Sequence, residues 1–422
     1  MLDLSERDAR VVWHPYTQHG VEPEPLAVAG AAGAWLELAD GRRVLDAISS
    51  WWATLHGHAH PALVAAMTAQ AARLDHVLFA GATHEPAVRL AEELLAVAPP
   101  GLQRVFYSDD GSTAVEVAIK MVLQAWAQRG EPARRVLIAL DGAYHGDTFG
   151  AMAAGDPDPF FRDLQPLFFE VRRVPAVAEA LRGALADLGD RAAGFILEPL
   201  LQGAAGMRIM SVDFVRAARA LCDEHGVPLI ADEVMTGFGR TGAMFACERA
   251  GIAPDVLCLA KGLTGGMLPL AATLATEELF ACFLHDERSR FFPHGHTFTA
   301  NPIACAVALA SLQLCRDHDV PGRLAAIGAG LFVQLEDLRG HPRVADLRHL
   351  GGMVGIDLRA PSGDAGYLSQ LAPWLRREAL ARDVLLRPLG NVLYALPPAC
   401  VNDAEVAQLA AAMRELVTGA PG

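Results

Sequence analysis

With 422 residues, 52% of them hydrophobic, the chain can bury a large core and is long enough for two or three domains of about 150 residues. Its net charge of -14 and its scattered basic residues argue against a nucleic-acid partner. The chain has no apolar run of membrane-spanning length, no apolar signal segment at its N-terminus and no CxxC pair among its seven cysteines, so we expect a cytoplasmic protein with reduced thiols.

Apolar runs of strand length alternate with longer stretches of helical pattern. In chain order, strands are predicted at 104–107, 136–140, 194–197, 228–231, 256–259 and 270–274, with helices at 112–128, 173–188 and 211–226. This alternation predicts an α/β fold with a mostly parallel sheet that is buried on both faces. Ligands of such sheets bind beyond the carboxyl ends of the strands, so residues that follow a strand are the first candidates for a site.

The pattern also divides the chain into domains. Residues 55–315 carry the alternation and are predicted to form a large domain. A long Ala/Leu helix after Asn301-Pro302 leads into residues 316–422, where 353–358 and 391–396 have the pattern of strands in a smaller α+β domain. Residues 1–54 contain a further strand pattern at 34–38 and are expected to join that smaller domain.

Two strand ends offer contacts for a planar, phosphorylated ligand. Gly111 and Ser112 follow the strand that ends at Tyr107 and begin a helix, whose free N–H groups, hydroxyl and dipole suit a phosphate. In isolation such a sequence is more often a helix cap. Tyr144 lies between glycines after the next strand and is able to lie flat on a planar ligand.

Two further strand ends carry charged residues. Asp232 and Glu233 follow one buried strand, and one of them is expected to point into the crevice, where a protonated pyridine nitrogen would pair with it. Lys261 follows the next strand and, with Lys120, is one of only two lysines among 35 basic residues. Codon bias would explain an isolated lysine, but a desolvated lysine forms a Schiff base and arginine does not. A site for pyridoxal phosphate needs a lysine, a carboxylate, an aromatic ring and a phosphate-binding helix start, and these four strand ends offer that set.

Longer motifs identify a family. The stretch 229–242, continuing through Ala253-Pro254-Asp255 to Lys261-Gly262, resembles the signature of class III pyridoxal-phosphate aminotransferases of fold type I. The resemblance implies a seven-stranded sheet in the large domain. The motifs at 13–18, 50–57, 144–148, 202–207 and 387–388 resemble the branch of that class that aminates 8-amino-7-oxononanoate in biotin formation.

The resemblance implies roles for the residues that contact the cofactor. Lys261 would bind pyridoxal phosphate covalently and move a proton, and Asp232 would bind its pyridine nitrogen. Gly111 and Ser112 would bind the phosphate. Tyr144 would stack on the ring, and Val234 would pack on its opposite face. Thr297 of a neighbouring subunit would complete the phosphate site, which implies a homodimer with shared active sites.

The resemblance also implies a substrate channel. Its expected residues are Tyr16, Trp51, Trp52, Tyr144, Lys261, Gly295, Arg387 and Tyr394, with Arg387 binding the distal carboxylate of the acceptor. Glutamate-using members of the class carry Glu and Arg where this chain has Ala204 and Tyr394. The aromatic wall instead suits a bulky cationic donor through cation–π contact, with S-adenosylmethionine first and lysine as the alternative.

Some residues depart from the family pattern. His296 replaces a proline, Ala300 lies in a changed Thr-Ala-Asn motif, and His58 stands where tyrosine is common. These changes affect the expected shape of the local loops and not the cofactor chemistry. His56, His58 and His60 are not expected to bind a metal, because no carboxylate or cysteine cluster supports them.

A broad ω-amino acid or diamine transaminase, and an aminomutase that needs no second substrate, remain as alternative functions.

Overall fold

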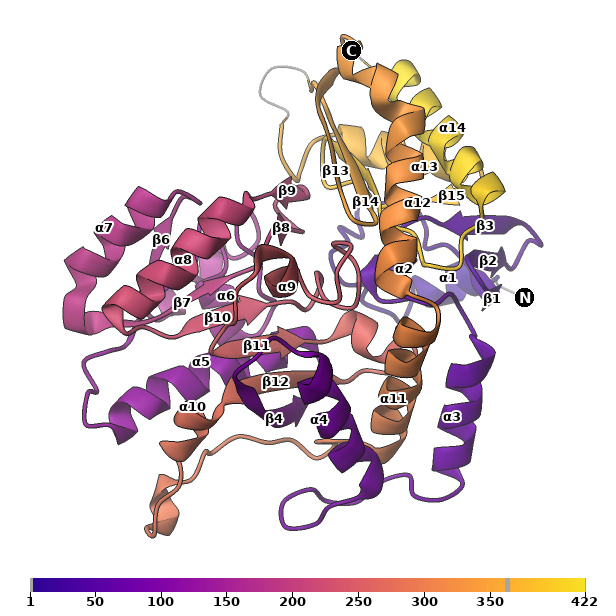
Figure 1. Ribbon diagram of the computed structural model, residues 1–422. Coiled ribbons are helices and arrows are strands. Elements are labelled where there is room, and N and C mark those ends of the chain that lie inside the picture. Colours follow the sequence, from indigo (N-terminus) through magenta and orange to yellow (C-terminus); the bar gives the residue numbers. More distant parts are fainter. Residues whose placement is uncertain (1–2, 361–364, 422) are drawn as a thin grey trace.

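The computed structural model describes residues 3–360 and 365–421, and its largest element is a seven-stranded sheet (Figure 1). The strands lie in the order β4 (Leu102–Ser108), β12 (Ala271–Thr276), β11 (Val256–Leu259), β10 (Leu229–Asp232), β7 (Ala192–Leu197), β5 (Val136–Leu140) and β6 (Val171–Val174). Pairing is parallel except at β12, which runs antiparallel to both β11 and β4. The predicted α/β fold with a mostly parallel seven-stranded sheet is confirmed.

Helices cover both faces of this sheet. Leu137 and Ala139 of β5 belong to a core shared with α5 (Gly111–Gln128). Ile138 and Leu140 belong to the other core, which includes residues of α7 (Ala178–Leu188) and α8 (Val212–His225). Successive side chains of a strand point to opposite faces, so a strand covered on both faces must be apolar at every position. All five residues of β5 are buried, which explains its uninterrupted apolar sequence.

The predicted strands agree with the structure, but one helix boundary is wrong. The helix expected at 173–188 begins only at Ala178, and residues 171–174 form the edge strand β6 instead. Arg172 and Arg173 occupy the middle of that strand, and Arg173 donates to the carbonyl oxygens of Ala153 and Gly155. An edge strand needs no continuous apolar run, so its sequence did not show the pattern used to find the central strands.

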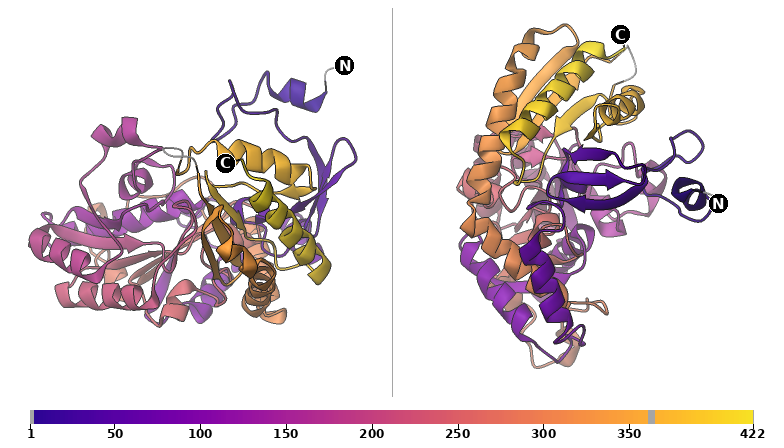
Figure 2. Two further views of the ribbon diagram at one scale, coloured as in Figure 1. Left: turned by 90° about the horizontal axis from the view of Figure 1, so that it is seen from above. Right: turned by 90° about the vertical axis from the view of Figure 1, so that its right-hand side faces the viewer.

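Two smaller sheets lie beside the large one (Figure 2). One contains β1 (Val28–Ala32), β2 (Trp35–Leu38), β3 (Arg43–Asp46) and β15 (Val384–Leu385), and the other contains β13 (Val344–Leu350), β14 (Met353–Leu358) and β16 (Val392–Ala395). The parallel pairing of β3 with β15 joins the N-terminal segment to the C-terminal part of the chain. A short ribbon, β8 (Leu201–Gln202) with β9 (Arg208–Ile209), follows β7.

The remaining helices connect these layers. They are α1 (Leu4–Asp8), α2 (Ser49–Trp52), α3 (Pro61–Ala71), α4 (Glu85–Val97), α6 (Phe149–Ala154), α9 (Ala246–Ala250), α10 (Glu277–Ala281), α11 (Pro302–Asp317), α12 (Val320–Leu335), α13 (Leu371–Leu380) and α14 (Asp403–Gly419). Short 3-10 turns include η3 (Lys261–Thr264), directly after β11. Within the described part of the chain, none of the helices combines the length and apolar character that a membrane crossing requires.

Candidate active site

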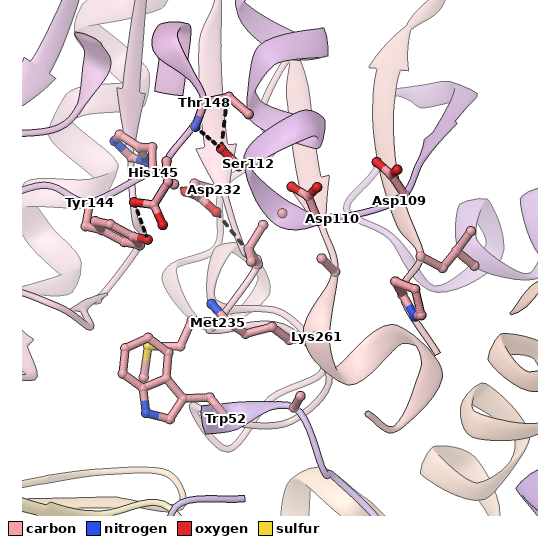
Figure 3. A pocket seen from close by; sticks show the side chains of 18 of the residues that line it. Trp52, Asp109, Asp110, Ser112, Tyr144, His145, Thr148, Asp232, Met235 and Lys261 are labelled. Atoms are coloured by element: carbon pink, nitrogen blue, oxygen red, sulfur yellow. Dashed lines mark hydrogen bonds and ion pairs between the residues drawn. The ribbon is translucent and has the colours of Figure 1, made fainter. Parts of the chain in front are cut away.

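A cavity of about 630 Å³ lies where several strands of the large sheet end (Figure 3). Among its lining residues are Gly111, Ser112, Tyr144, Asp232, Val234 and Lys261, which follow β4, β5, β10 and β11. Trp52 and Ala53 close the cavity from the N-terminal segment. Parallel strands bring their carboxyl ends to one edge of a sheet, and this topology gathers residues that are up to 150 positions apart in the chain.

Lys261 is held in a constrained backbone conformation. It is the first residue of η3, and its φ of 42° lies in the left-handed region that side chains rarely adopt. Its Nζ lies 4.9 Å from the centroid of the Trp52 ring. Burial lowers the pKa of the Lys261 amine, although the carboxylates of Asp232 and Glu198 partly oppose that shift. A larger fraction of the amine is therefore unprotonated and able to act as a nucleophile at neutral pH.

Asp232 is fixed by two contacts inside the cavity. Its Oδ2 lies 2.7 Å from Nδ1 of His145, and its Oδ1 accepts a hydrogen bond from the backbone N–H of Val234 at 3.1 Å. Both side chains are buried. The other ring nitrogen of His145, Nε2, has no partner among the described residues. His145 was not predicted as a site residue, although it lies in the strand-end run that contains Tyr144.

Glu233 points away from the cavity. Its carboxylate accepts hydrogen bonds from the backbone N–H groups of Ala246 at 2.7 Å and Cys247 at 2.8 Å, at the start of α9. Burial raises the pKa of Glu233 to about 7, although these hydrogen bonds favour the charged form. Of the two adjacent carboxylates, Asp232 is therefore the one that lines the cavity.

Glu198 is a third buried carboxylate and does line the cavity. It accepts hydrogen bonds from the backbone N–H of Tyr144 at 3.1 Å and of Gly203 at 2.9 Å. Burial raises its pKa to about 7. Glu198 fixes the backbone of the segment that presents Tyr144, and no pattern in the sequence singled it out.

The start of α5 forms a cradle for an anionic group. The backbone N–H groups of Gly111 and Ser112 have no hydrogen-bond acceptor within the described chain, and they lie at the positive end of the helix dipole. The Ser112 hydroxyl lies 2.8 Å from that of Thr148 and accepts a hydrogen bond from the Thr148 N–H at 2.9 Å. A Cβ at Gly111 would lie 2.5 Å from Cγ1 of Val234, so only glycine fits there. These features suit a phosphate.

Three polar side chains form a network beside the cavity. The Tyr16 hydroxyl donates to Asp147 Oδ1 at 2.6 Å, the Tyr144 hydroxyl donates to the same atom at 3.0 Å, and the two hydroxyls lie 3.2 Å apart. Burial and the hydrogen bonds to Asp147 raise the pKa of both tyrosines above the ordinary value, although the contact with Tyr144 partly opposes the shift at Tyr16. Tyr16 and Tyr144 were predicted as site residues, but Asp147, which holds them together, was not.

A second cavity of about 320 Å³ adjoins the first and is mainly aromatic. Its walls include Tyr16, Trp51, Phe160 and Tyr367, and it shares Trp52, Tyr144, Asp147 and Lys261 with the larger cavity. Phe160 and Tyr367 were missed because they lie in loops without a recognisable motif. Because the two cavities share these residues, an aromatic space adjoins the cavity that contains Asp232 and Ser112.

Four predicted site residues lie outside the lining of both cavities. The Arg387 guanidinium lies over Trp51, with Cζ 4.5 Å from the ring centroid, and forms no hydrogen bond or ion pair with a described residue. Tyr394 is fully buried and accepts a hydrogen bond from Nε1 of Trp52 at 2.9 Å, so it supports the wall from behind. Gly295 and Thr297 lie on the connection from α10 to α11 and line neither cavity of the single chain.

The family model of the class-III aminotransferases matches residues 16–417. The chain is 49% identical to the adenosylmethionine-8-amino-7-oxononanoate aminotransferase of Synechococcus elongatus over 426 residues, which cover 96% of this chain and 98% of that one. It matches the crystal structure of adenosylmethionine-8-amino-7-oxononanoate aminotransferase from Methanocaldococcus jannaschii with a TM-score of 0.95 and 34% identity, over 99% of each chain. A PLP-bound amine transaminase from an uncultivated Pseudomonas species matches with a TM-score of 0.91 and 31% identity, over 97% of this chain and 99% of that chain.

Proposed function

The chain belongs to the class-III aminotransferases, and we propose that it transfers an amino group from S-adenosylmethionine to 8-amino-7-oxononanoate in biotin formation. The observation that carries the proposal is Arg387, a half-buried guanidinium that is unpaired among the described residues and lies over Trp51 beside the aromatic cavity. The acceptor has a carboxylate at one end of an aliphatic chain and a ketone near the other, which suits an arginine beside an apolar wall that extends to Lys261. A cytoplasmic location agrees with seven free thiols.

Pyridoxal phosphate is the cofactor of this family, and the larger cavity suits it. Gly111 and Ser112 would bind the phosphate, Asp232 the ring nitrogen, and Lys261 the aldehyde, while Tyr144 and Val234 would contact the ring. When bound, the cofactor supplies a carbonyl that accepts the amino group and a ring that withdraws electrons from the reacting carbon. The fit rests on the two free N–H groups at the start of α5 and on the lowered pKa of Lys261.

The side chains of the site would divide the work of the reaction. Lys261 would take a proton from the substrate carbon and return it, a role that its lowered pKa favours. Asp232, fixed by His145, would keep a proton on the ring nitrogen, since a buried carboxylate is stable opposite a cation. Trp52 would keep water from the reacting amine, because its ring lies 4.9 Å from Lys261 Nζ.

We propose a homodimer in which Thr297 of one subunit completes the phosphate site of the other. Thr297 is exposed and lines neither of the two cavities described above, which agrees with a role across an interface. A mixture of Thr297→Ala and Lys261→Ala subunits should then form heterodimers with one intact site and regain activity. If properly mixed dimers stay inactive while each parent dimer assembles normally, Thr297 does not act across the interface.

The donor is inferred from two positions without the side chains that bind glutamate. Ala204 lines the aromatic cavity, and Tyr394 is a buried phenol instead of an arginine. A dicarboxylate donor would therefore lack a partner for its α-carboxylate, whereas a cationic donor would contact the rings of Tyr16 and Trp51. Stopped-flow absorbance of the cofactor-loaded protein, with S-adenosylmethionine, lysine and glutamate at equal concentration, tests this. Efficient reaction with glutamate would contradict the proposal.

A broad amine transaminase is the second candidate, because a PLP-bound amine transaminase is 31% identical over almost the whole chain. Such an enzyme would not depend on Arg387 for its acceptor. Arg387→Ala should cost about 2 to 5 kcal/mol of acceptor binding if the carboxylate is bound there, with little effect on reaction with a donor that leaves the site empty. Unchanged acceptor saturation would favour the broad transaminase, and amino transfer without any second substrate would favour an aminomutase.

A further inference from the structure

The two tryptophans of the site lie on a left-handed helical turn. Ser49, Ser50, Trp51 and Trp52 have φ values of 50°, 44°, 70° and 75°. The turn is closed by hydrogen bonds from Trp52 N–H to the Ile48 carbonyl at 2.8 Å and from the Ala53 N–H to the Ser49 carbonyl at 2.9 Å. L-residues adopt this conformation at an energetic cost and usually singly, and none of the four is glycine. Other contacts must therefore stabilise the turn.

The buried carboxylate of Asp46, at the end of β3, receives hydrogen bonds from the turn and from its neighbour His58. Asp46 Oδ1 accepts from the backbone N–H of Ser50 at 2.9 Å and from that of Ile48 at 3.3 Å. Asp46 Oδ2 accepts from the Ser50 hydroxyl at 2.7 Å and lies 2.9 Å from Nε2 of His58. Burial would raise the pKa of Asp46, but the hydrogen bonds from His58 and Ser50 outweigh it and lower the pKa.

Two further contacts fix the first and the last residue of the turn. The Ser49 hydroxyl donates to the Leu396 carbonyl at 2.8 Å, and Arg240 donates to the Trp52 carbonyl at 3.1 Å. These contacts come from distant parts of the chain, so the turn is fixed only in the folded protein. Asp46 differs from Leu396 and Arg240 because it contacts the middle of the turn: its carboxylate accepts hydrogen bonds from the backbone N–H and the hydroxyl of Ser50.

The turn places two adjacent side chains on different walls of the site. Trp52 donates to the Tyr394 hydroxyl and lies 4.9 Å from Lys261 Nζ. Trp51 lies against Tyr16, with ring centroids 5.7 Å apart, and under Arg387. A right-handed turn would rotate successive side chains in the opposite sense and would not direct both rings to these partners.

We propose that Asp46 is a positioning residue for substrate binding, which acts by stabilising the left-handed turn that presents Trp51 and Trp52 to the site. His58 supports it by keeping the carboxylate oriented. Asp46 contacts no substrate in this scheme and moves no proton itself, so its main effect is on the saturation constants, with a smaller effect on turnover through Trp52 beside Lys261. The identity of the acceptor in the test rests on the proposed function, whereas the role of Asp46 does not.

The primary test is Asp46→Asn in the cofactor-loaded protein. The amide NH2 group replaces either Oδ2, which accepts from the Ser50 hydroxyl and contacts His58, or Oδ1, which accepts from the N–H groups of Ser50 and Ile48, so in both orientations Ser50 loses one acceptor. We expect KM for 8-amino-7-oxononanoate to rise about tenfold or more, and by a larger factor than kcat falls, because both rings line the site but only Trp52 lies beside the Lys261 amine. Asp255→Asn is the matched control. Like Asp46, Asp255 accepts a hydrogen bond from a backbone N–H, that of Leu229; it also accepts one from the guanidinium of Arg219, and it lines neither cavity. It should lower the melting temperature and leave KM unchanged.

Rescue by glycine separates positioning from general stability. Asp46→Asn/Ser50→Gly and Asp46→Asn/Ser50→Ala both lack the Ser50 hydroxyl, but only glycine adopts a positive φ at little cost. The glycine double variant should bind substrate about threefold more tightly or better than the alanine double variant. Equal saturation constants in the two would overturn the proposal, and so would an unchanged KM in Asp46→Asn.

A structural measurement tests the proposal independently of enzyme activity. The crystal structure of Asp46→Asn should show residues 49–52 displaced from the left-handed region, and an unaltered turn would overturn the proposal. If Asp46→Asn does not fold, Ser50→Ala against Ser50→Gly provides the same comparison with Asp46 intact. If the wild type does not use 8-amino-7-oxononanoate, the proposed function fails, and the variants are then compared by the saturation constant of the donor half-reaction.

Discussion

Replacing Gly111 with alanine tests the cofactor cradle directly. Gly111 begins α5, and a Cβ added there would lie 2.5 Å from Cγ1, 3.1 Å from Cγ2 and 3.4 Å from Cβ of Val234. The close contacts are with both methyl groups of Val234, and a β-branched side chain has few χ1 rotamers with which to move them away. The side chain of Val234 must therefore shift, and it lines the cavity in which we propose that the cofactor lies.

Overpacking of this kind typically costs about 1 to 3 kcal/mol. If the cost falls on the cofactor-bound state, the dissociation constant for pyridoxal phosphate should rise about 5- to 150-fold. Titration of the cofactor-free protein, followed by absorbance or by quenching of tryptophan fluorescence, measures that constant. Gly183→Ala is the control, because a Cβ at Gly183 in α7 meets no atom within 4 Å. It should leave cofactor affinity unchanged and stabilise the fold by about 0.4 to 1 kcal/mol.

The steric explanation also requires that the two substitutions are not additive. Val234→Ala removes both methyl groups that the new Cβ would meet, so Gly111→Ala should have little further effect in a Val234→Ala background. Cofactor affinity that is unchanged in Gly111→Ala, or that falls by the same factor in both backgrounds, would refute the reasoning.

Three further residues, with Lys120→Arg as a control, are tested by substitution of a charged side chain. Lys261→Ala should abolish turnover while Lys120→Arg retains it, and borohydride reduction followed by peptide mapping should label Lys261; label on Lys120 would contradict the assignment. Asp232→Asn should lose most activity and shift the absorbance of bound cofactor, because a neutral amide does not hold a proton on the ring nitrogen; near-normal turnover would contradict this. Glu233→Gln should change the pH dependence of stability. Burial raises the folded-state pKa of Glu233 to about 7 from an ordinary value of 4.5, so its stabilising effect is complete below 4.5 and is lost as pH rises to about 7. The melting temperature of Glu233→Gln relative to wild type should therefore rise between pH 4.5 and 7, and a constant difference would contradict that pKa.

The sequence was sufficient to predict the sheet and to predict that most of the expected cofactor residues lie together, and both results have one physical reason. A strand covered on both faces must be apolar throughout, so β5 and β11 were located residue by residue from composition alone. In a parallel sheet the carboxyl ends of the strands meet at one edge. Polar residues directly after the apolar runs, such as Asp232 and Lys261, were therefore expected together before any contact between them was known, and they line one cavity.

Where the determining contact comes from a distant segment, the sequence was not sufficient. The local pattern did not choose between Asp232 and Glu233, although the family resemblance implied Asp232, since the choice depends on His145, 87 residues away, and on the N–H groups of α9. Residues 173 and 174 of the edge strand β6 were predicted to start a helix, because the arginines of β6 interrupt the apolar pattern that marks the central strands.

The tertiary structure alone decided the conformation of the tryptophan turn. Local preferences of Ser49–Trp52 oppose a left-handed turn. Asp46, four residues before Ser50, stabilises the turn together with Arg240 and the carbonyl of Leu396, which come from distant segments of the folded chain. The sequence by itself determined which side chains are available at the strand ends, because burial imposes its pattern locally. Their orientation was determined by hydrogen bonds between segments far apart in the chain, which no local pattern records.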